Sequence, residues 1–403
     1  MSVRSLLRVF LTVLWLWPVA ALAQVEQWQG HMDAGFQAYQ QGNYAEAERQ
    51  WGSALKEAKR FGPQDPRLAT TLNNLAVLYK AQGKYAEAEP LYKRSLAIRE
   101  KALGPEHPDV ANSLNNLAAL YLVQGKYAEA EPLYKQALAI WEKALGPEHP
   151  HVAASLNNLA ELYRAQGRYA DAESLYKRAL AIWEKALGPE HPRVATTLNN
   201  LAGLYHNQGR YTEAEPLHKR SLAIVEKSLG PEHPQVATGL NNLAELYRAQ
   251  GKHAEAEPLY KRSLAIREKA LGAEHPLVAQ SLNNLAVLYR AQGRYAEAEP
   301  LHKHSLAIRE KALGAENPGV AQSLNNLAVL YEAQGKYAEA EPLYKRALSI
   351  REEALGPEHP QVATSLENYA ALLSKTERSG EAAKMEARAK AIRAKHARKN
   401  PAR

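Results

Sequence analysis

Histidine recurs in this chain at a spacing that could place metal ligands in register. The repeated position lies in a Glu-His-Pro motif every 42 residues, at His107, His149, His191, His233, His275 and His359, with Asn317 replacing one histidine. Each unit supplies one such histidine, and packed helices lie about 8–10 Å apart, whereas a zinc–nitrogen bond is about 2 Å long. Neighbouring histidines therefore cannot share an ion, and we expect them to begin helices or to lie in loops.

No other residue pattern predicts catalysis. The sequence has no His-Glu-x-x-His motif, phosphate-binding loop, Gly-x-Ser-x-Gly motif or dinucleotide glycine motif. It has no cysteine, which excludes a thiol nucleophile, a cysteine-based zinc site and disulfides. His218 and His302 stand where other units carry tyrosine, so we expect them in the core. We predict no enzymatic activity, no metal and no cofactor.

A pair of adjacent asparagines in each unit is the best candidate for binding a partner. The side chain of asparagine has both a donor and an acceptor, so it can pair with a peptide backbone. On a helical wheel the pairs lie close to the pole opposite the apolar stripe, beside positions that vary between units. The second members are Asn74, Asn116, Asn158, Asn200, Asn242, Asn284 and Asn326. Two interpretations stay open, because these amides can bind a partner or bond between neighbouring repeats.

Charged residues flank the asparagines in the middle of the chain. Glu161 precedes Arg164 by three residues, and Glu245 precedes Arg248 by the same distance, so each pair can meet on a helix surface. Arg290 occupies the arginine position in the following unit. We expect the two pairs to neutralise each other's charge rather than to clamp a carboxylate, and we include these residues in the predicted groove.

These candidate residues belong to one repeated unit of 42 residues. Prolines mark the period at Pro66, Pro108, Pro150, Pro192, Pro234, Pro276, Pro318 and Pro360. Seven full units cover 66–359, a shorter related unit covers 24–65, a degenerate capping unit covers 360–395, and a basic tail follows at 396–403. Repetition at this period predicts a solenoid, although the length alone suggests two or three domains.

Each unit has the pattern of two amphipathic helices. In the unit that begins at Pro108, apolar residues from Leu114 to Tyr121 recur at helical spacing, Gly125 interrupts them, and a second apolar stripe follows. Proline suits the first turn of a helix, where its missing N–H is harmless. A single hairpin cannot bury its stripe alone, so we expect neighbouring hairpins to stack.

The repeated residues resemble the tetratricopeptide repeat. Leu114, Leu117-Ala118, Tyr121, Gly125 and Tyr127 match its pattern, as do Ala130, Tyr134 and Ala137. The 42-residue unit, with Leu-Asn-Asn-Leu-Ala and Leu-Gly-Pro-Glu-His-Pro, is similar to the variant in kinesin light chains. The resemblance implies an all-α, right-handed superhelical solenoid whose first helices line a concave groove, where the second asparagine of each pair contacts extended peptides. The chain lacks the heptad segment of a true kinesin light chain, so motor binding is not implied.

The amino terminus has the composition of a secretory signal. Residues 1–23 carry Arg4 and Arg8, no acidic residue, and an apolar run that ends in Ala21-Leu22-Ala23. The run of about 15 residues is shorter than the about 20 that a spanning helix needs. We therefore predict cleavage before Gln24 and export of a bacterial protein to the periplasm or the outside, with an uncleaved anchor as the alternative.

The positive charge is concentrated at the two ends of the chain. The formal net charge is +8, but the signal and the segment 375–403 carry the excess, which leaves the repeats nearly neutral. We therefore expect protein or peptide partners in the groove and no nucleic acid there. An alternative function is binding to an anionic surface (membrane, polysaccharide or nucleic acid) through the basic C-terminal tail. The sequence predicts no particular oligomeric state.

Overall fold

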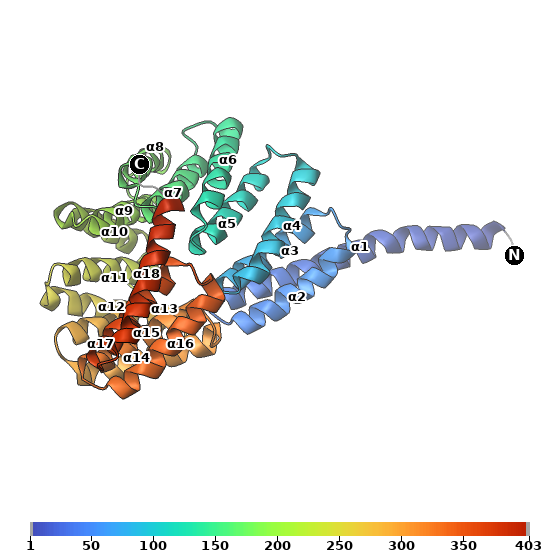
Figure 1. The fold of residues 1–403 in the computed structure, drawn as a ribbon. Coiled ribbons are helices and arrows are strands. Elements are labelled where there is room, and N and C mark those ends of the chain that lie inside the picture. Colours follow the sequence, from blue (N-terminus) through green and yellow to red (C-terminus); the bar gives the residue numbers. More distant parts are fainter. Residues whose placement is uncertain (1–2, 400–403) are drawn as a thin grey trace.

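The computed structural model describes the backbone of residues 3–399 and the side chains of residues 22–398, and over this range the chain is an all-α solenoid. Its helices form consecutive antiparallel hairpins (Figure 1). The helices are α1 (Val3–Gln40), α2 (Tyr44–Arg60), α3 (Pro66–Ala81), α4 (Tyr85–Leu103), α5 (Pro108–Val123), α6 (Tyr127–Leu145), α7 (Pro150–Ala165), α8 (Tyr169–Leu187), α9 (Pro192–Asn207), α10 (Tyr211–Leu229), α11 (Pro234–Ala249), α12 (His253–Leu271), α13 (Pro276–Ala291), α14 (Tyr295–Leu313), α15 (Pro318–Ala333), α16 (Tyr337–Leu355), α17 (Pro360–Lys375) and α18 (Ser379–Lys399).

The boundaries of each hairpin follow from its glycines and prolines. In the hairpin α5–α6, Pro108 is the first helical residue, where its missing N–H breaks no helical bond. Gly125 has φ +68° in the turn between the helices, and Gly146 has φ +87° at the end of the second helix. Both values lie in the region that side chains rarely adopt, so glycine terminates each helix at a fixed place.

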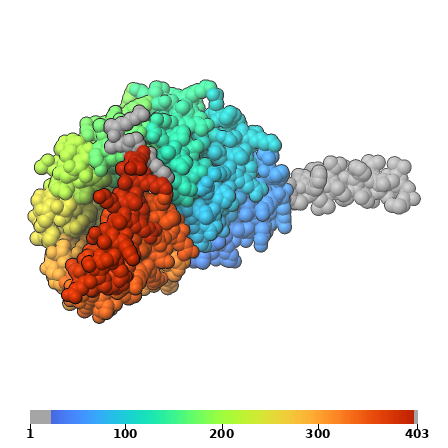
Figure 2. Space-filling model, in the orientation of Figure 1, coloured from blue at the N-terminus to red at the C-terminus, as the bar shows by residue number. Residues whose placement is uncertain are grey.

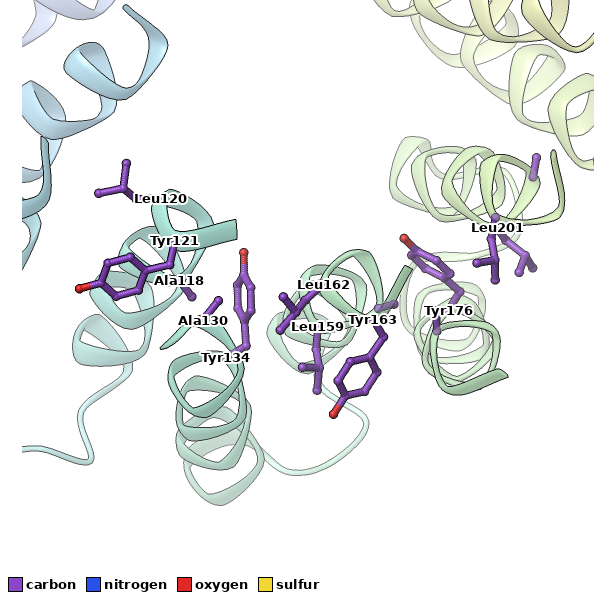
Figure 3. Packing of buried hydrophobic residues seen from close by; sticks show 14 of the residues in the cluster. Ala118, Leu120, Tyr121, Ala130, Tyr134, Leu159, Leu162, Tyr163, Tyr176 and Leu201 are labelled. Atoms are coloured by element: carbon purple, nitrogen blue, oxygen red, sulfur yellow. The ribbon is translucent and has the colours of Figure 1, made fainter. Parts of the chain in front are cut away.

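Neighbouring hairpins bury their apolar stripes against each other. Figure 3 shows Tyr134 of one hairpin facing Leu159 and Leu162 of the next. Ala118 and Ala130 are fully buried, which lets the two helices of a hairpin approach closely. Tyrosine hydroxyls extend the packing between units, as where Tyr121 donates to a carboxylate of the preceding hairpin. Tyr121 and Tyr134 are both buried in this packing.

The array curves because its two layers of helices are spaced differently. Adjacent first helices, such as α9 and α11, contact each other directly, whereas the second helices lie further apart. The first helices therefore line the concave face, and the array winds as a right-handed superhelix (Figure 1). The predicted fold class is confirmed.

The superhelix turns far enough for its last units to touch its first units (Figure 2). We call the row of turns within hairpins the turn edge, and the row of connections between hairpins the loop edge. Three members of the turn edge meet three members of the loop edge. The turns 41–43, 82–84 and 124–126 lie against the loops 272–275, 314–317 and 356–359, respectively.

Each of these three contacts has a hydrogen bond between a loop side chain and the end of a first helix. The Asn317 amide donates to the Ala81 carbonyl at 3.3 Å, across 236 residues of chain. His275 and His359 hydrogen bond in the same way with the backbone of Gln40 and Val123. Loop side chains that are otherwise half-exposed are thereby buried.

The N-terminal helix α1 packs on the array from the predicted cleavage position onwards. The Gln24 amide donates to the backbone carbonyl of Glu57, and the Trp28 indole donates to the Thr71 hydroxyl at 2.9 Å. Side chains 1–21, which make up most of the predicted signal, lie outside the described residues. Within the described part of the chain, none of the helices is both long and apolar enough to cross a membrane.

The C-terminal helix α18 lies along the last repeats, and its basic residues bond to their carboxylates. Arg393 forms an ion pair with Glu367, and Lys395 forms one with Glu358. Further along, the ring of His396 packs edge-on against Tyr127, with 5.3 Å between their centroids. Residues 400–403 of the predicted tail lie outside the described residues. The ion pairs reduce the charge that α18 offers to an anionic surface, so that function stays a prediction without structural support.

Candidate ligand-binding groove

The repeated histidines cap helices. The Nδ1 atom of His107 accepts a hydrogen bond from the backbone N–H of Asp109 at 3.1 Å, and the other loop histidines cap their helices in the same way. In the unit that has Asn317 in place of histidine, the Oδ1 atom of Asn317 caps the helix and accepts a hydrogen bond from the Gly319 N–H at 2.7 Å. The expectation that these residues begin helices or lie in loops is confirmed, because each one caps the start of a first helix. Among the described residues, no cluster of three or more histidine, aspartate or glutamate side chains could hold a metal ion.

The asparagine pairs form a ladder along the concave face. The Asn116 amide donates to the Asn73 carbonyl oxygen at 2.8 Å, so the second asparagine of one unit bonds the first asparagine of the preceding unit. The same bond, at 2.9–3.0 Å, is donated by Asn242, Asn284, Asn326 and Asn368. These amides link neighbouring repeats, as one of the two sequence-based interpretations proposed. A second amide hydrogen remains on each of them for a ligand.

The ladder is interrupted in the middle of the array. The amides of Asn115 and Asn157 donate to hydroxyls of the following unit, on Ser155 and Thr197. The carbonyl oxygens of Asn115 and Asn157 are consequently buried without a partner within the described structure. The pattern would pair these oxygens with the amides of Asn158 and Asn200. Because those bonds are not made, the N–H groups and the carbonyl oxygens of both side chains remain available. The groove thus has two unmatched rungs at its centre.

Two identical charged clusters lie in the units on either side of the unit 192–233. Arg164 forms a bidentate ion pair with Glu161, with one bond at 3.0 Å, and Tyr176 donates to the same carboxylate at 2.9 Å. Burial acts to raise the pKa of Glu161, but its bonds to Arg164 and Tyr176 outweigh burial and lower it. The expected pairing of Glu161 with Arg164 is observed, so this cluster presents little net charge.

The second cluster repeats this geometry two units later. Arg248 pairs with Glu245, with one bond at 3.0 Å, and Tyr260 donates to Glu245 at 2.6 Å. The unit between the clusters has lost all three side chains. Its corresponding residues are Gly203, His206 and His218.

These replacements leave a pocket on the concave face of about 200 Å³. Gly203 has open space where its side chain would be, and Glu161, Arg164, Asn200, Asn242 and Glu245 stand around it. His218 is buried beneath, bonded to Asn199 at 3.0 Å, and burial lowers its pKa to about 4. The Nε2 atom of His206 is buried without a partner among the described residues.

The structure thus brings together only part of the predicted site. Asn200, Asn242, Glu161, Arg164 and Glu245 converge on the pocket, and Asn158 lies one unit before it. Arg248 faces Glu245 and does not line the pocket. The remaining predicted residues are spread along the groove at Asn74, Asn116, Asn284, Asn326 and Arg290. Gly203, His206 and His218 were not among the predicted site residues, although these three positions differ from the corresponding positions of the neighbouring units.

Paired antiparallel helices stacked into a curved array with an open concave face define the class of helical-repeat solenoids. A family model for the tetratricopeptide repeat matches residues 31–101, 73–143, 109–185, 152–206, 193–269, 235–311, 277–353 and 319–395. The chain belongs to the tetratricopeptide repeat family, with the 42-residue unit of the kinesin-light-chain-like type. The recognition made from the repeated residues is confirmed.

Solved structures with similar repeats include proteins from several sources. The nearly identical TPR-like repeats of a putative kinesin light chain from Podosopora anserina are 36% identical, with a TM-score of 0.43, covering 51% of this chain and 97% of that one. BtubC from P. vanneervenii is 26% identical, with a TM-score of 0.45, covering 61% and 92%. A Rap protein complexed with Competence and Sporulation Factor is 16% identical, with a TM-score of 0.60 over 93% and 99%, and shares the fold. No curated protein sequence matches the chain.

Proposed function

We propose that the chain is a scaffold that binds an extended peptide or protein segment along its concave face, with the Gly203 pocket as the central contact. The proposal rests on one observation, the polar pocket at the interruption of the asparagine ladder. Free amides at Asn158 and Asn200 can donate to and accept from a peptide backbone. The bidentate pairing of both glutamates leaves the pocket without a dominant charge, which favours an uncharged polar ligand group.

The pocket can be filled by copying its neighbours. The triple variant Gly203→Glu, His206→Arg and His218→Tyr would reproduce the cluster of Glu161, Arg164 and Tyr176. Its control is the double variant Val77→Glu and Lys80→Arg, which builds the same cluster around Tyr92 near the N-terminal end. Both variants place side chains that this fold already accommodates, so we expect both to remain folded.

A random-peptide display library supplies the probe for this test. We expect the chain to select peptides whose affinity, measured by calorimetry, falls at least about tenfold in the triple variant, a change of about 1.4 kcal/mol. The control variant should bind as the unmodified chain does. Failure to select any peptide, or equal binding by the triple variant, would contradict the proposal.

We also propose that the chain is exported after cleavage before Gln24. Support comes from the basic and apolar composition of residues 1–23 and from the packing of α1 that begins at Gln24. Expression in a Gram-negative bacterium followed by fractionation should give a processed protein outside the cytoplasm whose first residue is Gln24. An unprocessed protein in the cytoplasm would contradict export without bearing on the groove.

A further inference from the structure

The loop edge has further capping side chains of the kind that bond across the superhelix, but these make no such long-range bond. In the three closed contacts, the loop residue caps its own helix and also bonds to the end of a first helix one superhelical turn away. Four earlier loops have the same capping geometry, at His107, His149, His191 and His233. Because Nδ1 accepts the capping bond, the ring hydrogen of the neutral side chain is on Nε2, where it can be donated.

The turn edge has backbone carbonyls that correspond to the acceptors in the closed contacts but make no such contact. Gln40, Ala81 and Val123 each stand two residues before a turn glycine and take part in the closed contacts. The corresponding carbonyls in the last three regular hairpins are those of Ala249, Ala291 and Ala333. Within the described residues, no backbone hydrogen bond reaches these three carbonyls. Carbonyls at the end of a helix need a partner outside it.

Leucines at the two groups of loops show the same contrast. Leu271, Leu313 and Leu355 end their helices at the closed contacts and are half-buried there. Their counterparts at the free loops are exposed by 36–40%. These are Leu103, Leu145, Leu187 and Leu229. The free part of the loop edge therefore has both the polar and the apolar groups of a contact that forms elsewhere in the same chain.

The chain cannot satisfy these groups by itself. Asn317 bonds a carbonyl that lies 236 residues earlier, and the other two closed contacts have nearly the same separation. A loop residue 236 positions after Ala165, or after the corresponding residue of any later turn, would lie beyond the end of α18. A second copy that continued the superhelix after α18 would place its loops 104–107, 146–149 and 188–191 on the turns 250–252, 292–294 and 334–336.

We propose that the free loop edge of one copy docks on the free turn edge of a second copy, head to tail. The two surfaces differ, so the interface is heterologous and each copy keeps one free edge for a further copy. The assembly is then an open chain of copies that extends the concave groove rather than a closed dimer. We expect weak association, with a dissociation constant between about 1 µM and 1 mM, so sedimentation coefficients should rise with protein concentration over this range.

A turn-edge variant tests one side of this interface. Ala45, Ala86 and Ala128 line the closed contacts. Their counterparts on the free turns are Ala254, Ala296 and Ala338, and both sets are exposed. The variant Ala254→Glu, Ala296→Glu and Ala338→Glu adds acidic residues to the first turns of helices, which is favourable for folding. It would set them against Glu106, Glu148 and Glu190 of the docking loops.

A loop-edge variant tests the other side. Changing Leu103, Leu145 and Leu187 to lysine puts cations in the last turns of helices, where they are also favourable. The control variant Ala139→Glu, Ala181→Glu and Ala223→Glu has the same charge change as the turn-edge variant, at exposed positions in the middle of second helices. None of the substitutions touches the three closed contacts.

Sedimentation velocity on the full chain distinguishes the outcomes. We expect the unmodified chain and the control variant to associate with increasing concentration, and each edge variant to remain monomeric alone. An equimolar mixture of the two edge variants should form dimers and nothing larger, because each variant keeps the edge that the other has lost. A chain that stays monomeric at 1 mM, roughly the upper end of weak protein association, would overturn the proposal. Association that persists in both edge variants would also overturn the proposal. Loss of association in the control variant would do the same.

Discussion

Three early loops and three late loops have nearly the same sequence and different surroundings. The early loops are 146–149, 188–191 and 230–233, and the late loops are 272–275, 314–317 and 356–359. Each contains Gly-x-Glu followed by the capping residue. The early histidines are half-buried, whereas His275, Asn317 and His359 are buried against the first superhelical turn.

The helices that precede these loops differ at one buried position. Before the late loops this position holds Arg267, Arg309 and Arg351, and before the early loops it holds Trp141, Trp183 and Val225. Arg309 donates to the backbone carbonyl of Gly319 at 2.8 Å and to the Ser323 hydroxyl at 3.1 Å. Burial lowers the pKa of Arg309 to about 10.

This difference shows that a repeat is not a self-contained structural unit. Trp141 stacks on the His151 ring, with 4.4 Å between the two ring centroids. The arginines instead bond the backbone just after the capping residue in the late loops, and Arg99 makes the same bond at the free loop 104–107. Neighbouring repeats interact pairwise, but the superhelix adds contacts between units far apart in the chain.

Acidification should give the largest difference between the two groups of loops. Burial lowers the pKa of His359 to about 4, below the ordinary histidine value of about 6.5. Between these pH values the unfolded chain binds more protons than the folded chain, so stability falls as the pH falls. The expected loss at this histidine is about 3 kcal/mol at pH 4, measured by chemical unfolding across the pH range.

Asn317 provides the control for this prediction, because it shows that asparagine can cap the helix and make the long-range bond. The variant His359→Asn should therefore lose part of the pH dependence. The matched substitution is His191→Asn, in an early loop whose capping residue is only half-buried. His218 and His302, whose pKa values burial also lowers to about 4, add to this pH dependence. So do His151 and His275, whose pKa values burial lowers as well. An equal effect of the two substitutions would show that His359 is not the group that titrates.

Adding a methyl group to a turn glycine should give the next largest difference. Gly83 and Gly251 have φ values of +75° and +74°, so alanine at either position costs about 1–2 kcal/mol in backbone strain. A Cβ on Gly83 would lie 2.5 Å from Pro318 Cδ, whereas one on Gly251 would have open space. We expect Gly83→Ala to cost about 1–3 kcal/mol more than Gly251→Ala.

Urea unfolding measures the total cost, and hydrogen exchange at 314–317 locates it. Because solenoids can unfold in segments, local exchange is the sharper measurement. Faster exchange at 314–317 in Gly83→Ala alone would support the closed contact. Equal exchange in the two variants would show that the first and last turns do not touch.

Removing a capping side chain should give the smallest difference. His233→Ala and His275→Ala each lose a helix cap worth about 1 kcal/mol. His275→Ala also leaves the Gln40 backbone without its partner, which adds about 1 kcal/mol. Hydrogen exchange of the first amides of α11 and α13 should show the larger loss of stability in His275→Ala. The variant His275→Asn should not show this larger loss. Matching losses in the two alanine variants would indicate that the bond to Gln40 contributes nothing.

Much of the fold could be predicted from sequence because its determinants are local. Pro108 and Gly125 fix the ends of helices within a few residues, and the spacing of Leu114 and Tyr121 defines the buried stripe. The candidate site was only partly predictable. Gly203 and His218 lie on different helices of one unit, and the space they leave is bounded by side chains of both neighbouring units.

The 42-residue period, the paired helices, the place of the histidines in loops or at helix starts, and the family all follow from the sequence alone. The stacked array decides which loops are buried, where the asparagine ladder is interrupted and which edges remain free. These features depend on the small rotation from each hairpin to the next, accumulated over the array. No local pattern specifies that sum, so the bond between Asn317 and Ala81 has no signature in either segment alone.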